Sequence, residues 1–274
     1  MIRYIFIFLI SLNSYAFTLN TNIDAGFDKR EVKISVTSNS TCTNAGITAN
    51  DLLDMANEAA EKFWNRVPTS YLRMKSGGIL ETADSKYQTG ELCVTDSASV
   101  CDSATSIPKA NDIVISCNSN TTDNFKSSSY LALSIPNNFS GNKISGSIII
   151  INDSANSVFS TLSRDEMVNV LGHEIGHAIG LGHTDDKAAL MYHTEFSKRH
   201  RLGQDDIDGV TYLYSNKLHG LTDCSGIFGG TINMDSSKEI KKSISFLLFM
   251  LIGFFITFII RFLTRTSLRF HSFN

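Results

Sequence analysis

One eleven-residue segment constrains the fold more than any other part of this 274-residue chain, and it reads HEIGHAIGLGH over residues 173–183. If the segment starts as a helix, His173 and His177 lie one turn apart on the same face. The chain must then leave the helix, because His183 can reach the same point only through a reversal. Gly180 permits the positive φ that such a reversal needs. The segment therefore predicts a helix that ends in a tight turn.

The three imidazoles of this segment have the spacing of a metal site. Three protein ligands and one open position are typical of catalytic zinc, whereas a structural zinc site is closed by four protein ligands. We therefore expect His173, His177 and His183 to bind one zinc ion. Glu174 lies beside them and is expected to act as general base toward water without binding the metal. The pattern with its glycine and third histidine arises by chance in about one chain in 10^5, which disfavours three unrelated histidines.

Two helices can be placed from their start signals and apolar faces. Ser163 and Glu166 form a capping box, which predicts that the helix carrying the histidines covers residues 164–179. An earlier helical pattern opens at Thr48 and keeps one broad apolar face as far as residue 64. Pro68 follows, as is common beyond the end of a helix.

Five further stretches have the composition or alternation of β-strands. These are residues 31–37, 71–83, 112–117, 130–135 and 144–151. Gly77-Gly78 interrupts the second stretch, and Pro136 with two asparagines predicts a turn after the fourth. The fifth ends in four isoleucines and is too apolar for a strand with one wet face, so we expect it in the sheet interior. Strands interleaved with long helices predict an α/β or α+β domain with one sheet and helices packed against it.

The first sixteen residues have the pattern of a secretory signal. Arg3 precedes an apolar run over residues 4–12, and the small residues Ser14 and Ala16 fit cleavage after Ala16. The run is too short to span a bilayer of about 30 Å. A short buried helix or a retained anchor is the alternative. We expect residues 1–16 to be a signal peptide and the rest to be exported.

The C-terminal part contains a second apolar run. Residues 244–260 are almost wholly apolar and have no polar face, which favours a membrane-spanning helix over a buried one. We expect a folded domain over residues 17–220, a linker over 221–242, a transmembrane helix over 243–263 and a cytoplasmic tail over 264–274. Flanking charges do not settle the orientation of the transmembrane helix. The predicted export signal does, and it places the domain outside, at the cell surface or in the periplasm. The run also resembles the sorting tails of exported bacterial proteins, whose anchor is later removed.

Five cysteines are compatible with disulfides in an exported protein. Cys93 and Cys101 enclose a short polar segment and are expected to pair, which leaves Cys42 with Cys117. Four cysteines allow three pairings, so the other two stay open. Cys224 is left over, either free or paired between chains. The absence of a CxxC spacing disfavours a cysteine-ligated zinc site.

The charge balance bears on the class of partner. The formal net charge is -3, with 24 basic and 27 acidic residues. A protein that binds nucleic acid usually carries a broad basic surface, so we expect no nucleic-acid partner. The membrane is expected as a partner only through the C-terminal helix.

The segment over residues 173–183 resembles the metzincin metalloproteases, whose HExxHxxGxxH pattern is followed by a methionine-containing turn. Within that clan the chain looks most like the matrixins. Residues 183–192, HTDDKAALMY, are similar in spacing to the matrixin run from the third histidine to the Met-turn, and residues 202–214 resemble the helix that follows. The resemblance extends in layout over residues 27–215 and is specific in its motifs over residues 164–215.

The resemblance implies a metzincin-like catalytic domain. Such a domain has a twisted, mostly parallel five-stranded sheet with one antiparallel edge strand, two long helices and a C-terminal helix. It also implies that Met191 forms an apolar floor beneath the zinc, and that Asp205 and Asp206 cap the last helix and brace the Met-turn.

The same resemblance implies where a substrate lies. Leu131, Leu133 and Ile135 would belong to the edge strand and pair with an extended substrate by strand addition. Tyr192 and His193 would also bind the substrate, with His193 on the wall of the primary specificity pocket. Matrixins usually have a proline where His193 stands, so cleavage specificity cannot be transferred from the family.

The implied cofactor is one catalytic zinc ion. No histidine precedes residue 173, so the second, structural zinc of the family has no histidine ligands here and is expected to be absent. Calcium bound by carboxylates such as Asp153 is an open alternative with no support in the sequence.

Two functions were weighed on these grounds. The first is a zinc-dependent endopeptidase that hydrolyses peptide bonds of extracellular or periplasmic proteins, with Glu174 as general base. The alternative is a membrane-anchored binding or adhesion module that contains zinc and cleaves nothing. The complete ligand set and the intact Glu174 favour the endopeptidase.

Overall fold

The computed structural model describes residues 17–20, 25–40, 42–93 and 104–216. The predicted signal peptide, linker, transmembrane helix and tail lie outside the described residues, as do Cys101 and Cys224. Within the described ranges, no helix has the length and apolar character needed to cross a membrane.

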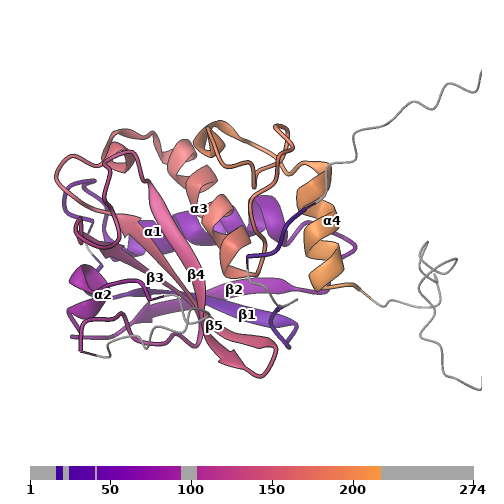
Figure 1. Cartoon of the computed structure of the whole chain (residues 1–274), viewed down its shortest axis with the longest axis horizontal. Helices are drawn as coiled ribbons and strands as arrows, with labels where there is room; N and C mark the ends of the chain where they lie inside the picture. The colour runs from indigo at the N-terminus through magenta and orange to yellow at the C-terminus, as the bar shows by residue number, and fades with distance from the viewer. Residues whose placement is uncertain (1–16, 21–24, 41, 94–103, 217–274) are drawn as a thin grey trace, which may run out of the picture. The chain divides into compact units, whose positions relative to one another are not determined.

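A single five-stranded sheet forms the centre of the domain (Figure 1). Its strands are β1 (Glu31–Thr37), β2 (Arg73–Leu80), β3 (Asp112–Asn118), β4 (Ala132–Ser140) and β5 (Lys143–Asn152). They follow the order β2-β1-β3-β5-β4, and all neighbouring pairs are parallel except β4 with β5. The predicted mostly parallel sheet with one antiparallel edge strand is therefore confirmed.

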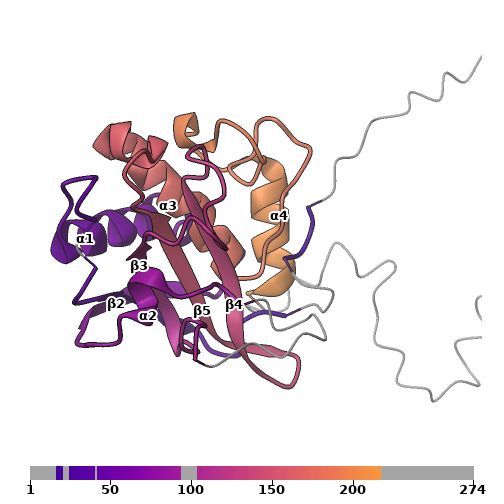
Figure 2. The ribbon, with the colours of Figure 1, turned by 60° about the vertical axis from the view of Figure 1, so that its left-hand side comes forward.

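Helices cover both faces of this sheet unequally. The elements are α1 (Ala49–Ala59), the π-helix η1 (Ala60–Trp64), α2 (Lys86–Thr89), α3 (Arg164–Ala178) and α4 (Gln204–Leu213). Two 3-10 turns, η2 (Val158–Thr161) and η3 (Phe196–Lys198), complete the regular structure. Figure 2 shows α1 and α3 on one face, with the short α2 on the other. The histidine segment therefore lies on the face that the two longer helices, α1 and α3, cover.

The isoleucine run in β5 explains why the sheet is buried on both sides. Ile149 and Ile151 belong to the main core beneath α1 and α3. Ile148 and Ile150 belong to a smaller core that includes Tyr87 of α2. Successive strand residues point to opposite faces, so a strand that is buried on both faces reads as a continuous apolar run. The predicted interior position of this strand is confirmed.

The fourth strand differs from its sequence-based prediction. The proline and asparagines at 136–138 do not turn the chain; β4 continues through them to Ser140 with a register shift between Pro136 and Asn138. Proline is tolerated here because β4 is an edge strand. The side chains of Asn137 and Asn138 bond to the backbone N–H and C=O of Ala110. These contacts with a distant segment replace the local turn that the sequence favoured.

The second strand also continues where a break was predicted. Gly78 has a φ of 78°, and the register with β1 shifts at Ile34/Ser35. The glycine pair therefore forms a bulge within β2 rather than its end.

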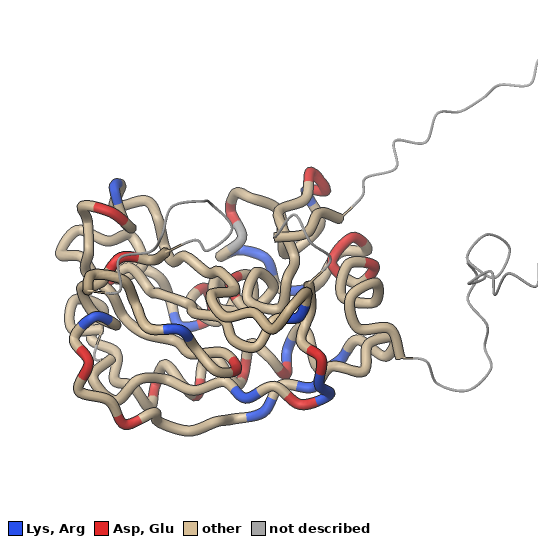
Figure 3. Tube along the Cα trace, turned by 60° about the horizontal axis from the view of Figure 1, so that its bottom comes forward, with Lys and Arg blue, Asp and Glu red and all other residues tan. Residues whose placement is uncertain are grey.

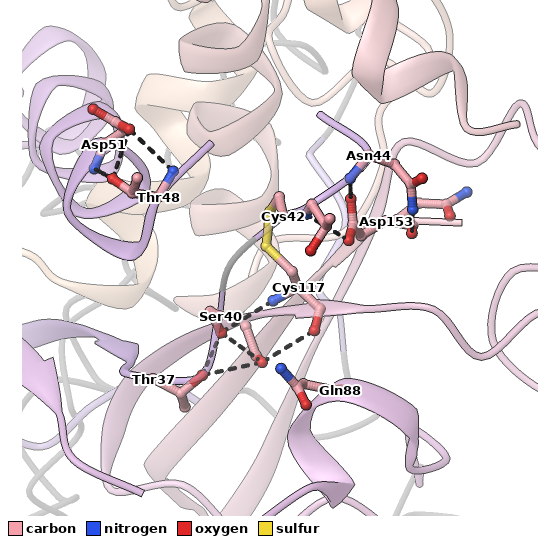
Figure 4. Close-up of a disulfide and its surroundings, with 12 residues drawn as sticks. Thr37, Ser40, Cys42, Asn44, Thr48, Asp51, Gln88, Cys117 and Asp153 are labelled. Atoms are coloured by element: carbon pink, nitrogen blue, oxygen red, sulfur yellow. Dashed lines mark hydrogen bonds between the residues drawn. A yellow bond between two sulfur atoms is a disulfide. The ribbon is translucent and has the colours of Figure 1, made fainter. Parts of the chain in front are cut away.

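A disulfide between Cys42 and Cys117 links the segment after β1 to strand β3 (Figure 4). The expected pairing of these two cysteines is confirmed. Beside it, the carboxylate of Asp153 accepts hydrogen bonds from the backbone N–H groups of Thr43 and Asn44, at 2.9 and 3.0 Å. A disulfide between cysteines as far apart in the sequence as Cys42 and Cys117 stabilises a fold by about 4 kcal/mol. Both contacts secure the chain on the α1 side of the sheet.

Candidate metal centre

Helix α3 brings two of the three histidines together. His173 and His177 lie one turn apart, and their Nε2 atoms are 3.1 Å from each other. The Nε2 atom of His177 is also 3.2 Å from that of His183. One ligand atom from each of the three residues lies within 4.8 Å of the others. The predicted convergence of the three imidazoles is therefore present in the fold.

The reversal that returns His183 to this point is made by Gly180. Its φ is 108°, and the N–H groups of Gly180 and Leu181 donate to the carbonyls of His177 and Gly176. A Cβ atom at Gly180 would also lie 2.5 Å from the carbonyl oxygen of Ala25. Both the dihedral and the close approach require glycine here.

Backbone carbonyls set the tautomers of the first two histidines. Nδ1 of His173 lies 2.7 Å from the carbonyl oxygen of Leu190, and Nδ1 of His177 lies 2.8 Å from that of Leu181. A carbonyl oxygen can only accept, so both Nδ1 atoms donate and both Nε2 atoms present lone pairs. Such hydrogen bonds fix the ring orientation of metal-binding histidines.

Burial keeps the imidazoles of His173 and His177 neutral. Desolvation, followed by the neighbouring histidines, lowers the pKa of His173 well below its ordinary value, and the pKa of His177 falls to about 4 for the same reasons. Desolvation also lowers the pKa of His183. Neutral imidazole is the form that binds a metal.

The arrangement fits a zinc ion. Lone pairs 3.1 Å apart repel each other unless a cation lies between them. Ligand nitrogens at about 2.05 Å from a tetrahedral zinc are themselves about 3.3 Å apart, close to the 3.1 and 3.2 Å that separate Nε2 of His177 from Nε2 of His173 and of His183. The donor set and its spacing therefore match what this metal requires.

Glu174 lies beside the histidines with one unbonded oxygen. Its side chain is 3% exposed, and within the described part of the chain its Oε2 atom has no hydrogen-bond partner. Burial raises the pKa of Glu174 to about 8. A buried carboxyl oxygen without a partner is unfavourable unless water or a ligand binds it, so Glu174 has the environment of a group that exchanges a proton.

The turn that contains Met191 is held beneath the histidines by α4. The carboxylate of Asp206 accepts hydrogen bonds from the N–H groups of Leu190, Met191 and Gly203, at 2.6, 3.0 and 2.7 Å. The hydroxyl of Thr184 donates to Asp205. Asp206 thus braces this turn in the manner that the resemblance implied and caps α4 from its third position, whereas Asp205 bonds to Thr184.

A cleft of about 620 Å³ opens at the histidines. Its lining comes from the N-terminal segment, the start of β4, α3 and the turn after it: Thr18, Leu19, Asn20, Ser129, Tyr130, Leu131, Ala132, Leu133, Ser134, His173, Glu174, His177, Gly182, His183 and His193. Of the predicted substrate contacts, Leu131, Leu133 and His193 line it, whereas Ile135 and Tyr192 do not.

Charge is sparse in this cleft. Among the described residues that line it, Glu174 is the one acidic or basic residue apart from the histidines. Elsewhere along the described chain, Lys and Arg positions are interspersed with Asp and Glu positions (Figure 3). The cleft therefore offers hydrogen-bonding groups and apolar surface rather than a concentration of charge of one sign.

The sequence interpretation missed the contribution of residues 17–20. The backbone of Thr18 accepts from Gly182 at 2.8 Å, and the Thr18 hydroxyl donates to the carbonyl of His183. The side-chain amide of Asn20 donates to the carbonyl of His177 at 3.1 Å. No local pattern predicts these bonds, because the partners are more than 150 residues apart.

Comparisons with known proteins agree with this geometry. Residues 104–215 match the family model of the matrixins. Metalloendoproteinase 1 of Glycine max is 45% identical over 54 residues, which are 19% of this chain and 18% of that protein. Matrix metalloproteinase-18 of Xenopus laevis is 48% identical over 48 residues (16% and 10%). Interstitial collagenase of Oryctolagus cuniculus is 47% identical over 49 residues (18% and 10%). The chain covers less than a fifth of the length of each of these relatives.

Proposed function

Because this chain carries a matrixin-like metzincin catalytic domain, we propose that it is a zinc-dependent endopeptidase. His173, His177 and His183 hold the metal, and Glu174 is the general base. The observation that carries the proposal is the convergence of three imidazole nitrogens beside a buried carboxylate with an unbonded oxygen.

A zinc ion held by these residues would supply Lewis acidity, which would let water lose a proton and attack a peptide carbonyl near neutral pH. Glu174 accepts the proton that the water loses. Glu174 then delivers this proton to the leaving amine nitrogen. Nδ1 of His173 and of His177 stay bonded to backbone carbonyls throughout, which keeps both rings in place.

The open edge of β4 supports the binding of an extended polypeptide. In the described residues no strand pairs with the side of β4 that faces away from β5. A substrate added there would pair with the backbone of residues 131–135, with Leu131, Leu133 and Ile135 along its path and with Tyr192 and His193 on the facing side. The apolar and polar lining of the cleft is compatible with such a chain.

The proposed substrates are extracellular or periplasmic proteins. The predicted signal over residues 1–16 and the transmembrane helix predicted over 243–263 favour an exported domain, residues 17–220, anchored by one C-terminal helix. The Cys42–Cys117 disulfide supports an oxidising compartment.

Replacing the proposed base tests the assignment. We expect Glu174→Gln to lower the rate of peptide cleavage at least about 10^2-fold while the protein keeps one equivalent of zinc, because the amide cannot accept the proton. The measurement combines a peptide-library cleavage assay with metal analysis of the 17–220 fragment, with and without a chelator. Full activity in this variant, or cleavage that survives zinc removal, would refute the mechanism. Zinc binding without cleavage by the wild type would favour the non-catalytic module.

A further inference from the structure

Ser134 has a hydroxyl that the proposed mechanism does not use. Its side chain is 8% exposed, and the structure as described shows no hydrogen-bond partner for Oγ. Ser134 lines the cleft together with His173 and Glu174. A buried hydroxyl without a partner is unfavourable, so a hydrogen bond from a group that reaches Ser134 from the cleft would be favourable.

The alternation along β4 places this hydroxyl on the α3 side of the sheet. Ala132, two residues earlier, packs in the core beneath α3, whereas Leu133 and Ile135 pack against the smaller core on the opposite face. Ser134 also pairs with Ile149, which lies in the core beneath α3. Residues two apart on a strand share a face. Ser134 therefore faces the helix that carries the metal centre.

A peptide on the open edge of β4 would continue the sheet and share its two faces. Every second side chain of that peptide then points to the α3 side, into the cleft that Ser134 lines. The side chain nearest Ser134 meets a hydroxyl in a lining with a single acidic residue, Glu174, and no Lys or Arg among its described residues.

We propose that Ser134 is a specificity-determining residue whose hydroxyl hydrogen-bonds a neutral substrate side chain carrying a hydroxyl or amide group. The inference rests on the proposed function, since it assumes a polypeptide in the cleft. A purely apolar side chain leaves Oγ unpaired and is disfavoured. A charged side chain is disfavoured because one hydroxyl does not compensate for the burial of a charge.

Matched peptides test this assignment. Each pair differs by threonine or valine at one position, and the position is scanned across both sides of the scissile bond. The readout is the ratio of the two kcat/KM values in one preparation, so zinc loading cancels. We expect the wild type to prefer threonine about tenfold at one position, Ser134→Ala to abolish this preference and Ser134→Thr to retain it. Ser140→Ala, on the exposed end of the same strand, should leave the ratio unchanged. An unchanged ratio in Ser134→Ala, or no preference in the wild type, overturns the assignment.

Binding without cleavage separates this inference from the proposed function. The same peptides are titrated by calorimetry into zinc-loaded Glu174→Gln protein, with and without Ser134→Ala. Tighter binding of the threonine peptide that depends on Ser134 supports the assignment even if the wild type cleaves nothing. Cleavage by the wild type with equal binding of both peptides refutes the role of Ser134 and leaves the endopeptidase in place. Equal binding, or none, with no cleavage refutes both.

Discussion

At the scale of single residues, two positions of α3 that carry no side chain admit close contacts, and one of them lies against the turn that contains Met191. A Cβ at Gly176 would lie 2.3 Å from Sδ of Met191 and 2.8 Å from the Trp64 ring. A Cβ at Gly172, one turn earlier, would lie 2.5 Å from the ring of Phe63. Gly176 therefore lets the turn that contains Met191 pack against α3, whereas Gly172 makes room only for a core side chain.

The two glycines give a matched pair of substitutions. We expect Gly176→Ala and Gly172→Ala each to lower the free energy of unfolding by about 1–3 kcal/mol, because each overpacks a buried contact. Gly176→Ala should also weaken zinc binding, since Met191 must move from its place under α3. Denaturant unfolding and competition with a chelating dye measure the two effects. Equal zinc affinity in both variants would contradict a role of Met191 in supporting the site.

At the scale of elements, α3 owes its start to a local cap. The carboxylate of Glu166 accepts from the backbone N–H of Ser163 at 2.9 Å and from its hydroxyl at 2.8 Å. These bonds hold the pKa of Glu166 below its ordinary value of 4.5, and the bond from the backbone N–H of Ser163 has the larger effect. The capping box that the sequence predicted is therefore confirmed in the structure.

This cap predicts a pH dependence with a definite sign. A carboxyl group whose pKa is lower in the folded state stabilises the fold above its unfolded pKa, and the contribution is lost as pH falls through the folded pKa. We expect Glu166→Gln to lower the free energy of unfolding at neutral pH, with a difference from wild type that shrinks below about pH 4.5. Urea titrations followed by circular dichroism measure it. Asp51→Asn, in the capping box of α1, should show the same pH dependence. A loss of unfolding free energy that does not vary with pH would show that the carboxylate is not the stabilising group.

Element boundaries were predictable where the signal is local. The ends of β1 and the start of α3 follow from alternation and from a cap, and both are as predicted. The path of β4 beyond Pro136 was not predictable, because Ala110 supplies the bonds that keep this stretch extended. That partner is more than 25 residues away, so propensity alone favoured a turn.

At the scale of the whole molecule, the site is assembled from distant parts of the chain. Asn20 bonds to the end of α3, and Asp206 of α4 holds the turn that contains Met191. His183 joins this assembly through a turn after the helix, so a bound ion would cross-link segments that are otherwise held by hydrogen bonds. Metal binding to the folded state alone adds to its stability by mass action.

Zinc removal should therefore destabilise the whole domain. We expect a chelator to lower the Tm of the zinc-loaded wild type by about 10 °C, and to leave the Tm of His183→Ala unchanged because that variant has lost a ligand. His193→Ala is the control. The ring of His193 lies 6.2 Å from that of His183, but His193 is not a proposed ligand, so the Tm of this variant should still fall when the chelator is added. A chelator effect that persists in His183→Ala would place the metal elsewhere.

The sequence by itself indicated most of the elements and predicted the convergence of three histidines, because helix caps, strand alternation and the spacing of His173, His177 and His183 are local properties of the chain. It could not show that residues 17–20 brace His183, that Gly176 admits Met191, or that Ser134 faces the cleft with an unpaired hydroxyl. Those features arise only when segments far apart in the chain pack together. Their energies depend on burial and on partners that no short stretch of sequence contains.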